Sequence, residues 1–233
     1  MQNKSQIIYF NSKNWAFHAS MVIQKKINKI LSYQNECTVM LTGGRSAEKI
    51  YNAWSEFSEF QQLSNVHFFF TDERCVSLDS SENIYSMVMR TLFKNNIPNG
   101  CSVSRIEADV LANSFVANKY AEKLPLCIDI ILLGLGDDGH IASLFPGSKA
   151  LNENIRSVVF VDAPKFPHKR ITITPAVIKR SKFIFMLASG SHKRKALSQA
   201  FSDTSDINSL PAILATNAIW LLDQNLNAKF TIT

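Results

Sequence analysis

A single histidine with an aspartate two residues before it is the first group in this sequence that could carry out acid and base chemistry. His140 and Asp138 follow an apolar run over residues 130–133 and lie among glycines that let the backbone approach a ligand closely. Imidazole exchanges protons near neutral pH, and a nearby carboxylate orients the ring or favours its charged form. A lone histidine is most often a structural residue. Its position at the carboxyl end of a buried strand favours a functional role, and we expect a helix to start there.

A glycine pair followed by an arginine and a serine is the second candidate site. Gly43, Gly44, Arg45 and Ser46 follow a predicted buried strand over residues 38–41, and a helix is expected from about residue 47. Such a turn between a strand and a helix aims backbone N–H groups and the helix dipole at an anion. It matches neither the dinucleotide fingerprint nor the P-loop, so plain loop geometry is the alternative.

Charged residues lie in two more predicted segments. Asp72, Glu73 and Arg74 form a turn directly after the aromatic strand over residues 66–70. Because buried charges are costly unless they pair or take part in chemistry, this cluster is either a local salt-bridge network or part of a site.

Lys193 lies in the first turn of an expected helix, where an exposed lysine opposes the helix dipole by about 0.3–1 kcal/mol. An anion bound beside Lys193 would explain that placement.

Strands and helices are expected to alternate along the whole chain, which is typical of an α/β fold with a mainly parallel sheet covered on both faces. No internal repeat or long linker is present, so we expect one domain over residues 1–233. Because parallel strands end at one edge, the turns that hold His140, Gly44 and Asp72 should meet there. Strands are predicted over 7–10, 38–41, 66–70, 130–133, 157–161, 170–174, 182–188 and 218–222. Helices are predicted over 84–93, 114–124, 192–201 and 210–215, with others from about 47 and 175, and a first long helix is capped by Asn11 or Ser12 and runs to about residue 31.

Composition and charge exclude several classes of protein. The 233 residues are 46% hydrophobic, enough for a full core, and carry a net charge of +6. Basic residues are concentrated in the last third, but no run reaches the roughly five or six like charges of a nucleic-acid tail. We therefore expect no nucleic-acid partner. The basic residues form either a solvated face or an edge that attracts a small anionic substrate.

Neither a metal site nor a membrane segment is expected. The four cysteines, Cys37, Cys75, Cys101 and Cys127, form no CxxC pair, and no histidine is spaced to complete a zinc site with them. They are typical of reduced thiols in the cytoplasm. Nowhere do about 18 apolar residues follow one another, and the first residues lead into a short strand rather than a leader peptide. We expect a cytoplasmic protein that is not inserted in a membrane.

Most of these polar residues belong to five motifs: Leu41-Thr-Gly-Gly-Arg-Ser46, Phe69-Phe-Thr-Asp-Glu-Arg74, Leu133-Gly-Leu-Gly-Asp-Asp-Gly-His-Ile-Ala-Ser-Leu-Phe-Pro-Gly147, Arg170-Ile-Thr-Ile-Thr174 and Gly190-Ser-His-Lys193. In this order they resemble the 6-phosphogluconolactonase family, within the wider glucosamine-6-phosphate isomerase-like fold. The resemblance covers nearly the whole chain and implies a three-layer αβα, modified Rossmann-like architecture. It also implies hydrolysis of 6-phospho-D-glucono-1,5-lactone to 6-phospho-D-gluconate, the second step of the oxidative pentose phosphate pathway, without metal or organic cofactor.

A lactone hydrolase needs an activated water, a stabilised oxyanion and a grip on the distant phosphate. We expect His140 to be the general base, and either Asp138 or Asp72 to be its principal carboxylate partner. Arg74 would face the oxyanion or the product carboxylate, while Asp72 would hold Arg74 or bind sugar hydroxyls. The family pattern places the phosphate among Gly44, Arg45, Ser46, Arg170 and Lys193, and Gly43 belongs to the same substrate-binding turn.

Two other functions fit a fold of this kind. Glucosamine-6-phosphate deaminases resemble this chain but carry a carboxylate where it has Phe145, and an aromatic residue where it has Arg74. Both differences favour the lactonase over an isomerase or deaminase. A non-catalytic sugar-phosphate sensor of the repressor type would need a DNA-binding segment before residue 7. A binding-only relative would also be expected to lose His140 or the Asp-Glu-Arg cluster.

Two positions depart from the commonest lactonase pattern. Many members have Ser-Thr-Pro after the glycine pair, whereas this chain has Arg45, Ser46 and Ala47. Arg45 therefore either joins the phosphate site or faces solvent. Asp137 replaces a residue that is often proline or alanine, and we assign it no role. The expected partner is a small phosphosugar lactone, bound by a monomer or a weak homo-oligomer.

Overall fold

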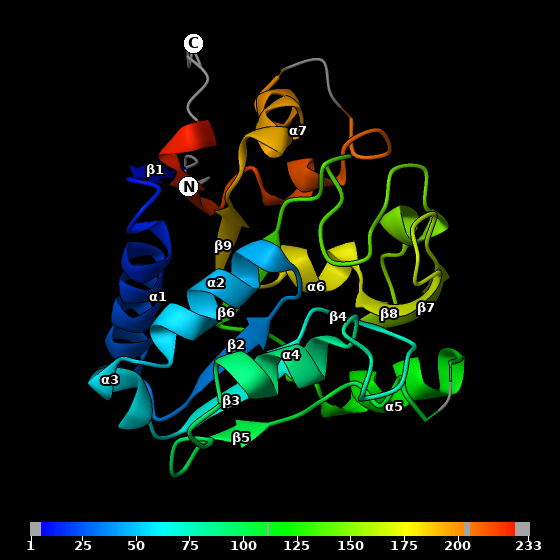
Figure 1. The fold of residues 1–233 in the computed structure, drawn as a ribbon. Coiled ribbons are helices and arrows are strands. Elements are labelled where there is room, and N and C mark those ends of the chain that lie inside the picture. The colour runs from blue at the N-terminus through cyan, green and yellow to red at the C-terminus, as the bar shows by residue number, and fades with distance from the viewer. Residues whose placement is uncertain (1–5, 111, 203–205, 227–233) are drawn as a thin grey trace.

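A parallel sheet forms the centre of the protein (Figure 1). The computed structural model describes residues 6–110, 112–202 and 206–226. Within these ranges, all neighbouring strands of a seven-stranded sheet are parallel, which confirms the predicted α/β fold. The strand order across the sheet is β1 (Gln6–Phe10), β10 (Ile219–Asp223), β9 (Phe183–Ala188), β6 (Ile130–Gly134), β2 (Cys37–Leu41), β3 (Val66–Phe70) and β5 (Ser102–Val103).

The central strands are apolar because both of their faces are buried. Ile130, Ile131, Leu132 and Leu133 of β6 follow one another in the chain, and none of them is exposed to solvent. Since successive side chains of a strand point to opposite faces, such a run requires cover on both sides of the sheet. The same composition allowed this strand to be predicted from the sequence.

Helices connect the strands and flank the sheet (Figure 1). In α1 (Trp15–Leu31), the residues Trp15, Ala19, Ile23 and Ile27 recur at helical spacing and are buried. No helix in the described ranges is both long and apolar enough to cross a membrane. The other α-helices are α2 (Arg45–Trp54), α3 (Ser58–Gln61), α4 (Ile84–Thr91), α5 (Ser114–Lys123), α6 (Pro175–Lys179) and α7 (Arg194–Ala200), and short 3-10 helices are η1 (Lys149–Asn152), η2 (Ser191–Lys193), η3 (Pro211–Ala215) and η4 (Gln224–Leu226).

A second, smaller sheet was not predicted. Its three antiparallel strands are β4 (Asp72–Arg74), β8 (Lys169–Ile173) and β7 (Val158–Asp162), in that order. The prediction of a turn over residues 72–74 is therefore wrong. The backbone stays extended after β3 and changes sheets at Thr71, whose N–H donates to the Leu41 carbonyl oxygen at 2.8 Å and whose own carbonyl oxygen accepts from the Ile173 N–H at 2.8 Å. A charged three-residue strand has no apolar pattern that would reveal it.

The segment around His140 is a loop, and the prediction that a helix starts there is wrong. Residues 135–148 contain turns and an isolated bridge but no helix. The loop closes on itself, because the Gly136 N–H donates to the His140 carbonyl oxygen at 2.8 Å. The position of His140 thus depends on loop contacts rather than on a helix terminus.

Candidate active site

Three strand ends meet in one cleft at the carboxyl edge of the parallel sheet, as the sequence predicts. Strands β2, β3 and β6 lead into the segments around Gly44, Asp72 and His140. All the predicted site residues except Asp138 line this cleft. Within the described ranges, the residues that line it are Thr42, Gly43, Gly44, Arg45, Ser46, Asp72, Arg74, Ile84, Gly134, Leu135, Gly136, Asp137, His140, Ala142, Lys165, Arg170 and Lys193.

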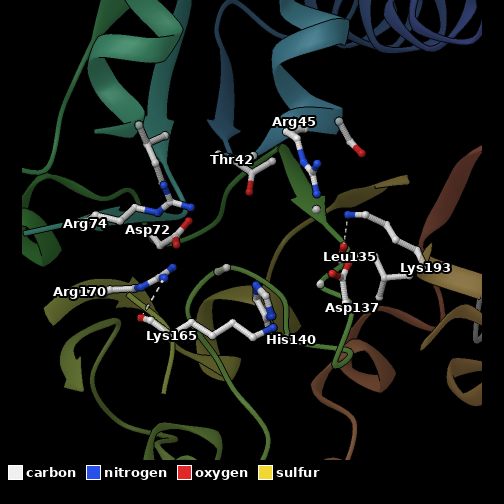
Figure 2. A pocket seen from close by; sticks show the side chains of 17 residues that line it. Thr42, Arg45, Asp72, Arg74, Leu135, Asp137, His140, Lys165, Arg170 and Lys193 are labelled. Carbon is white, nitrogen blue, oxygen red and sulfur yellow. Dashed lines mark hydrogen bonds between the residues drawn. The ribbon is translucent and has the colours of Figure 1, made fainter. Parts of the chain in front are cut away.

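Figure 2 shows basic side chains on two sides of the cleft, with His140 between them. Arg74 and Arg170 lie on one side, and they are register partners in the antiparallel pairing of β4 with β8. Arg45 and Lys193 lie on the other side, close to the starts of α2 and α7. The cleft is therefore suited to a ligand with anionic oxygens.

Asp138 is the carboxylate partner of His140. The Nδ1 atom of His140 lies 2.5 Å from Oδ1 of Asp138, and the backbone N–H of His140 donates to the same oxygen at 3.3 Å. This contact resolves the question of which aspartate pairs with the histidine, because Asp72 makes other contacts. With Nδ1 held by a carboxylate, Nε2 is the ring atom available for proton transfer with a ligand.

Gly136 and Phe145 hold the two faces of the imidazole. A Cβ atom on Gly136 would lie 2.0 Å from His140 Nδ1 and 2.3 Å from Cε1, so only glycine leaves room for the ring. On the other side, the Phe145 ring stacks at 4.4 Å between centroids and 30° between planes. Phe145 is 2% exposed and also lies under the Arg170 guanidinium, whose Cζ is 5.2 Å from the ring centroid. Its aromatic ring thus contacts two predicted site residues at once.

Asp138 also binds a lysine that was not among the predicted site residues. The Lys165 ammonium lies 2.8 Å from Oδ2 of Asp138, while His140 occupies Oδ1. Burial raises the pKa of Asp138, but the hydrogen bonds from His140 and Lys165 outweigh that effect and hold the pKa well below its usual range. The carboxylate is therefore ionised throughout the neutral range.

Asp72 is held by hydroxyl groups rather than by an arginine. This carboxylate is 3% exposed, and it accepts from Ser143 Oγ at 2.6 Å and from Thr71 Oγ1 at 3.1 Å. The side chain of Arg74 instead donates to the backbone carbonyl oxygen of Glu82 at 2.8 Å and to its carboxylate at 3.1 Å. The structure thus brings Asp72 and Arg74 into one cleft but gives each a different partner.

Glu73 lies between these two residues and points away from the cleft. It is 1% exposed, and its carboxylate accepts from the backbone N–H groups of Arg74, Ile84 and Tyr85 at 2.7–2.8 Å. Two of those donors, Ile84 and Tyr85, belong to the first turn of α4. Glu73 therefore links β4 to the start of α4. Burial raises the pKa of Glu73 to about 7, although the three N–H donors oppose this effect.

The glycine turn between β2 and α2 has the geometry of an anion site. Gly44 precedes the helix with a φ of 95°, a conformation that favours glycine, and Gly43 packs so closely on Ile84 that a Cβ atom would lie 2.7 Å from it. The Ser46 hydroxyl is buried and accepts from the Ser189 N–H at 3.2 Å, which ties α2 to the end of β9. The N-terminus of α2 consequently faces the cleft from a fixed position.

The remaining basic side chains differ in their surroundings. Arg170 is buried, and its Nε donates to the Pro167 carbonyl oxygen at 2.9 Å. Lys193 donates to the carbonyl oxygen of Leu135. Burial lowers the pKa of both residues. The Arg45 side chain is exposed and makes no hydrogen bond or ion pair with another side chain or backbone group in the described ranges.

Several residues that line the cleft were not predicted. Lys165 lies in a loop between β7 and β8 that contains two prolines, and nothing in its local sequence connects it with Asp138. Asp137, to which no role was assigned, also lines the cleft and lies 3.6 Å from His192. Among the described residues, no group of three or more histidine, cysteine or acidic side chains could hold a metal ion.

Comparison with known proteins shows the family. Residues 11–221 match the family described as glucosamine-6-phosphate isomerases/6-phosphogluconolactonase. This chain belongs to that family. Within the family, it is 33% identical over 219 residues to the 6-phosphogluconolactonase of Mycobacterium tuberculosis, covering 87% of this chain and 89% of the relative. It is also 34% identical over 188 residues to the 6-phosphogluconolactonase of Borreliella burgdorferi, with 76% and 78% of the two chains covered.

Solved structures from the family have the same fold. The 6-phosphogluconolactonase of Thermotoga maritima superposes with a TM-score of 0.82 at 27% identity, over 94% of this chain and 100% of that chain. The 6-phosphogluconolactonase of Trypanosoma cruzi gives a TM-score of 0.81 at 25% identity, over 99% and 98% of the two chains. The predicted glucosamine-6-phosphate isomerase-like architecture is thereby confirmed.

Proposed function

We propose that this enzyme hydrolyses 6-phospho-D-glucono-1,5-lactone to 6-phospho-D-gluconate, the second step of the oxidative pentose phosphate pathway. The observation that carries the proposal is the Asp138–His140 pair, at 2.5 Å, in a cleft lined by several basic residues. A histidine oriented in this way acts as a general base, and the basic residues attract a phosphorylated ester. The named relatives, all 6-phosphogluconolactonases, support the same reaction.

In the proposed mechanism, His140 Nε2 removes a proton from a water molecule that attacks the lactone carbonyl carbon. Asp138 stabilises the resulting imidazolium through Nδ1. Arg74 stabilises the oxyanion of the tetrahedral intermediate. The bond between the carbonyl carbon and the ring oxygen then breaks, and the imidazolium returns the proton to the ring oxygen, which becomes a hydroxyl. The new carboxylic acid ionises to the product carboxylate.

The proposed phosphate grip consists of the glycine turn at the start of α2 together with Arg45, Ser46, Arg170 and Lys193. Backbone N–H groups at a helix start, a guanidinium and an ammonium all bind dianionic phosphate. The positions of Lys193 and Arg45 beside the turn support this assignment (Figure 2). Arg170 lies on the side of Arg74, so it needs a test of its own.

Phe145 favours the lactonase over an isomerase or deaminase of the same family. A deaminase mechanism would use a carboxylate at this position to assist ring opening. Here an apolar ring stacks on His140 at 4.4 Å and contacts Arg170. A carboxylate placed there would lose both ring contacts and would be desolvated in a buried position.

We also propose that the enzyme acts in the cytoplasm as a monomer or a weak homo-oligomer. The cysteines Cys37, Cys75, Cys101 and Cys127 are all free, which supports a reducing compartment. Light scattering over a range of protein concentrations tests the oligomeric state, and cell fractionation tests the location.

The decisive experiment measures consumption of freshly generated lactone with and without the protein, at a pH where spontaneous hydrolysis is slow. We expect clear acceleration by the wild type and loss of turnover in His140→Ala with ligand binding largely kept. His67→Ala is the matched control, because His67 lies on β3 and bonds to Ser102 rather than lining the cleft. An inactive wild type would contradict the proposal, and a fall in affinity alone for His140→Ala would contradict its role as base.

Replacement of the basic residues tests the phosphate grip. Lys193→Ala and Arg170→Ala should weaken binding of the phosphorylated substrate while changing hydrolysis of an unphosphorylated lactone little. If either substitution affects both substrates equally, that residue does not bind the phosphate. For Arg170 this outcome would place the guanidinium at the carbonyl end, next to Arg74.

A further inference from the structure

Lys165 reaches the cleft from the smaller sheet. Its loop connects β7 to β8, and the Ala163 N–H donates to the His168 carbonyl oxygen at 2.6 Å at the base of this loop. The Arg170 side chain supports the loop from inside, through Nε to the Pro167 carbonyl oxygen at 2.9 Å. These hydrogen bonds fix the loop, so the Lys165 side chain extends from a well-supported hairpin into the cleft that also contains His140.

The Lys165 ammonium has N–H donors that no other described residue uses. An ammonium group carries three N–H donors, and among the described residues Lys165 Nζ contacts only the Asp138 carboxylate, at 2.8 Å. The Lys165 side chain is 47% exposed, so its remaining donors are open to a ligand. Asp138 also holds His140, which places the lysine at the end of the cleft where the proposed base acts (Figure 2).

We propose that Lys165 is a further substrate-binding residue. Its ammonium group, held in place by Asp138, binds an oxygen at the carbonyl end of the ligand. The inference rests on the proposed function, because that function defines which end of the ligand faces His140. In the substrate this oxygen belongs to the lactone group, and in the product it belongs to the carboxylate. Lys165 would therefore bind the product carboxylate more strongly than the neutral ester, since the carboxylate carries a full charge.

The phosphate group of the ligand is better placed beside Arg45 and Lys193 than beside Lys165. Those two residues lie across the cleft beside the glycine turn, where a helix N-terminus adds backbone donors (Figure 2). Lys165 instead lies in the loop between β7 and β8 and shares its carboxylate with the histidine. A ligand that spans the cleft would thus have its phosphate at one end and its carboxylate at the other.

Calorimetric binding of two ligands tests the proposal without depending on turnover. The ligands are 6-phosphogluconate and glucitol 6-phosphate, which has the same phosphate but an alcohol in place of the carboxylate. We expect Lys165→Met to weaken 6-phosphogluconate by about tenfold, the effect of roughly one charged hydrogen bond, and glucitol 6-phosphate by less than about twofold. Lys169→Met is the matched control, since Lys169 is an exposed lysine of the same hairpin that does not line the cleft.

A second comparison separates direct binding from a change in Asp138. Without Lys165, the Asp138 charge alone could repel the product carboxylate, so the same Lys165 substitution is repeated in Asp138→Asn. If Lys165 touches the ligand, its loss still weakens 6-phosphogluconate in that background. No effect there, or equal loss of both ligands in the single variant, would overturn the proposal. An inactive wild type that still shows the Lys165 effect would overturn the proposed reaction and leave the carboxylate contact standing.

Discussion

Gly136→Ala is the most informative single substitution, because it adds one methyl group directly against the imidazole of His140. The new Cβ would lie 2.0 Å from Nδ1 and 2.3 Å from Cε1. Ordinary contacts between such atoms begin near 3.4 Å. The ring must therefore move by more than about 1 Å, away from a position that Asp138 and Phe145 otherwise hold.

This displacement should cost much more activity than stability. A shift of about 1 Å in a catalytic group costs on the order of a hundredfold in rate, or about 2.7 kcal/mol in the activation barrier. The clash involves the end of a side chain rather than backbone, so we expect a loss in unfolding free energy near the lower limit for overpacking, about 1 kcal/mol. The added methyl group should therefore lower kcat strongly while changing the unfolding free energy only slightly.

The assay compares kcat on fresh lactone and urea unfolding for Gly136→Ala, the wild type and Gly134→Ala. The Gly134 substitution adds the same methyl group two residues earlier in the chain, where it meets only the Gly43 carbonyl oxygen at 3.7 Å. We expect Gly134→Ala to keep kcat within about threefold. If Gly136→Ala also keeps kcat within that range, or if both variants lose the same activity, the imidazole does not need the position seen in the structure.

Three further substitutions test the support of the site. Ser143→Ala removes the 2.6 Å hydrogen bond to the buried Asp72 carboxylate, so urea unfolding should show a loss of about 1.5–3 kcal/mol, and an unchanged midpoint would contradict the importance of this bond. Because burial raises the pKa of Glu73 to about 7, its contribution to stability is complete below about pH 4 and is lost as the pH rises through 7, by an amount on the order of 3 kcal/mol. Glu73→Gln cannot titrate and should flatten the decline in unfolding free energy between about pH 4 and pH 7; the same slope as in the wild type would refute the raised pKa. Phe145→Leu removes the ring stacked on His140 and should lower kcat about tenfold, whereas full activity would show that the 4.4 Å stacking does not position the imidazole.

The parts of the site that could be predicted from sequence all follow apolar strands. Strands β2, β3 and β6 have buried runs that mark their ends, and parallel strands carry those ends to one edge. The sequence alone therefore predicts that His140, Gly44 and Asp72 lie in one cleft. Lys193 could be expected beside an anion because of its place in the first turn of a helix, and the family motif then connected both Lys193 and Arg170 with the cleft.

What could not be predicted depends on contacts between distant segments. Lys165 meets Asp138 only because β7 and β8 fold their connecting loop over the end of β6. The pairing of Arg74 with Glu82 likewise depends on the path of the loop before α4. Charged residues have many possible partners of similar energy in an extended chain, so only the folded geometry selects one.

In the short charged strand β4, successive side chains point to opposite sides, so the three residues contact two different parts of the protein. Asp72 and Arg74 face the cleft, and Glu73 faces the start of α4. Inserting or deleting a single residue at Thr71, between the two sheets, would reverse that order. Glu73 would then turn towards the substrate, and the aspartate and the arginine would turn towards the helix. A one-residue change in the length of this junction should therefore exchange the groups that face the substrate, whereas a change of two residues should keep them on the same side.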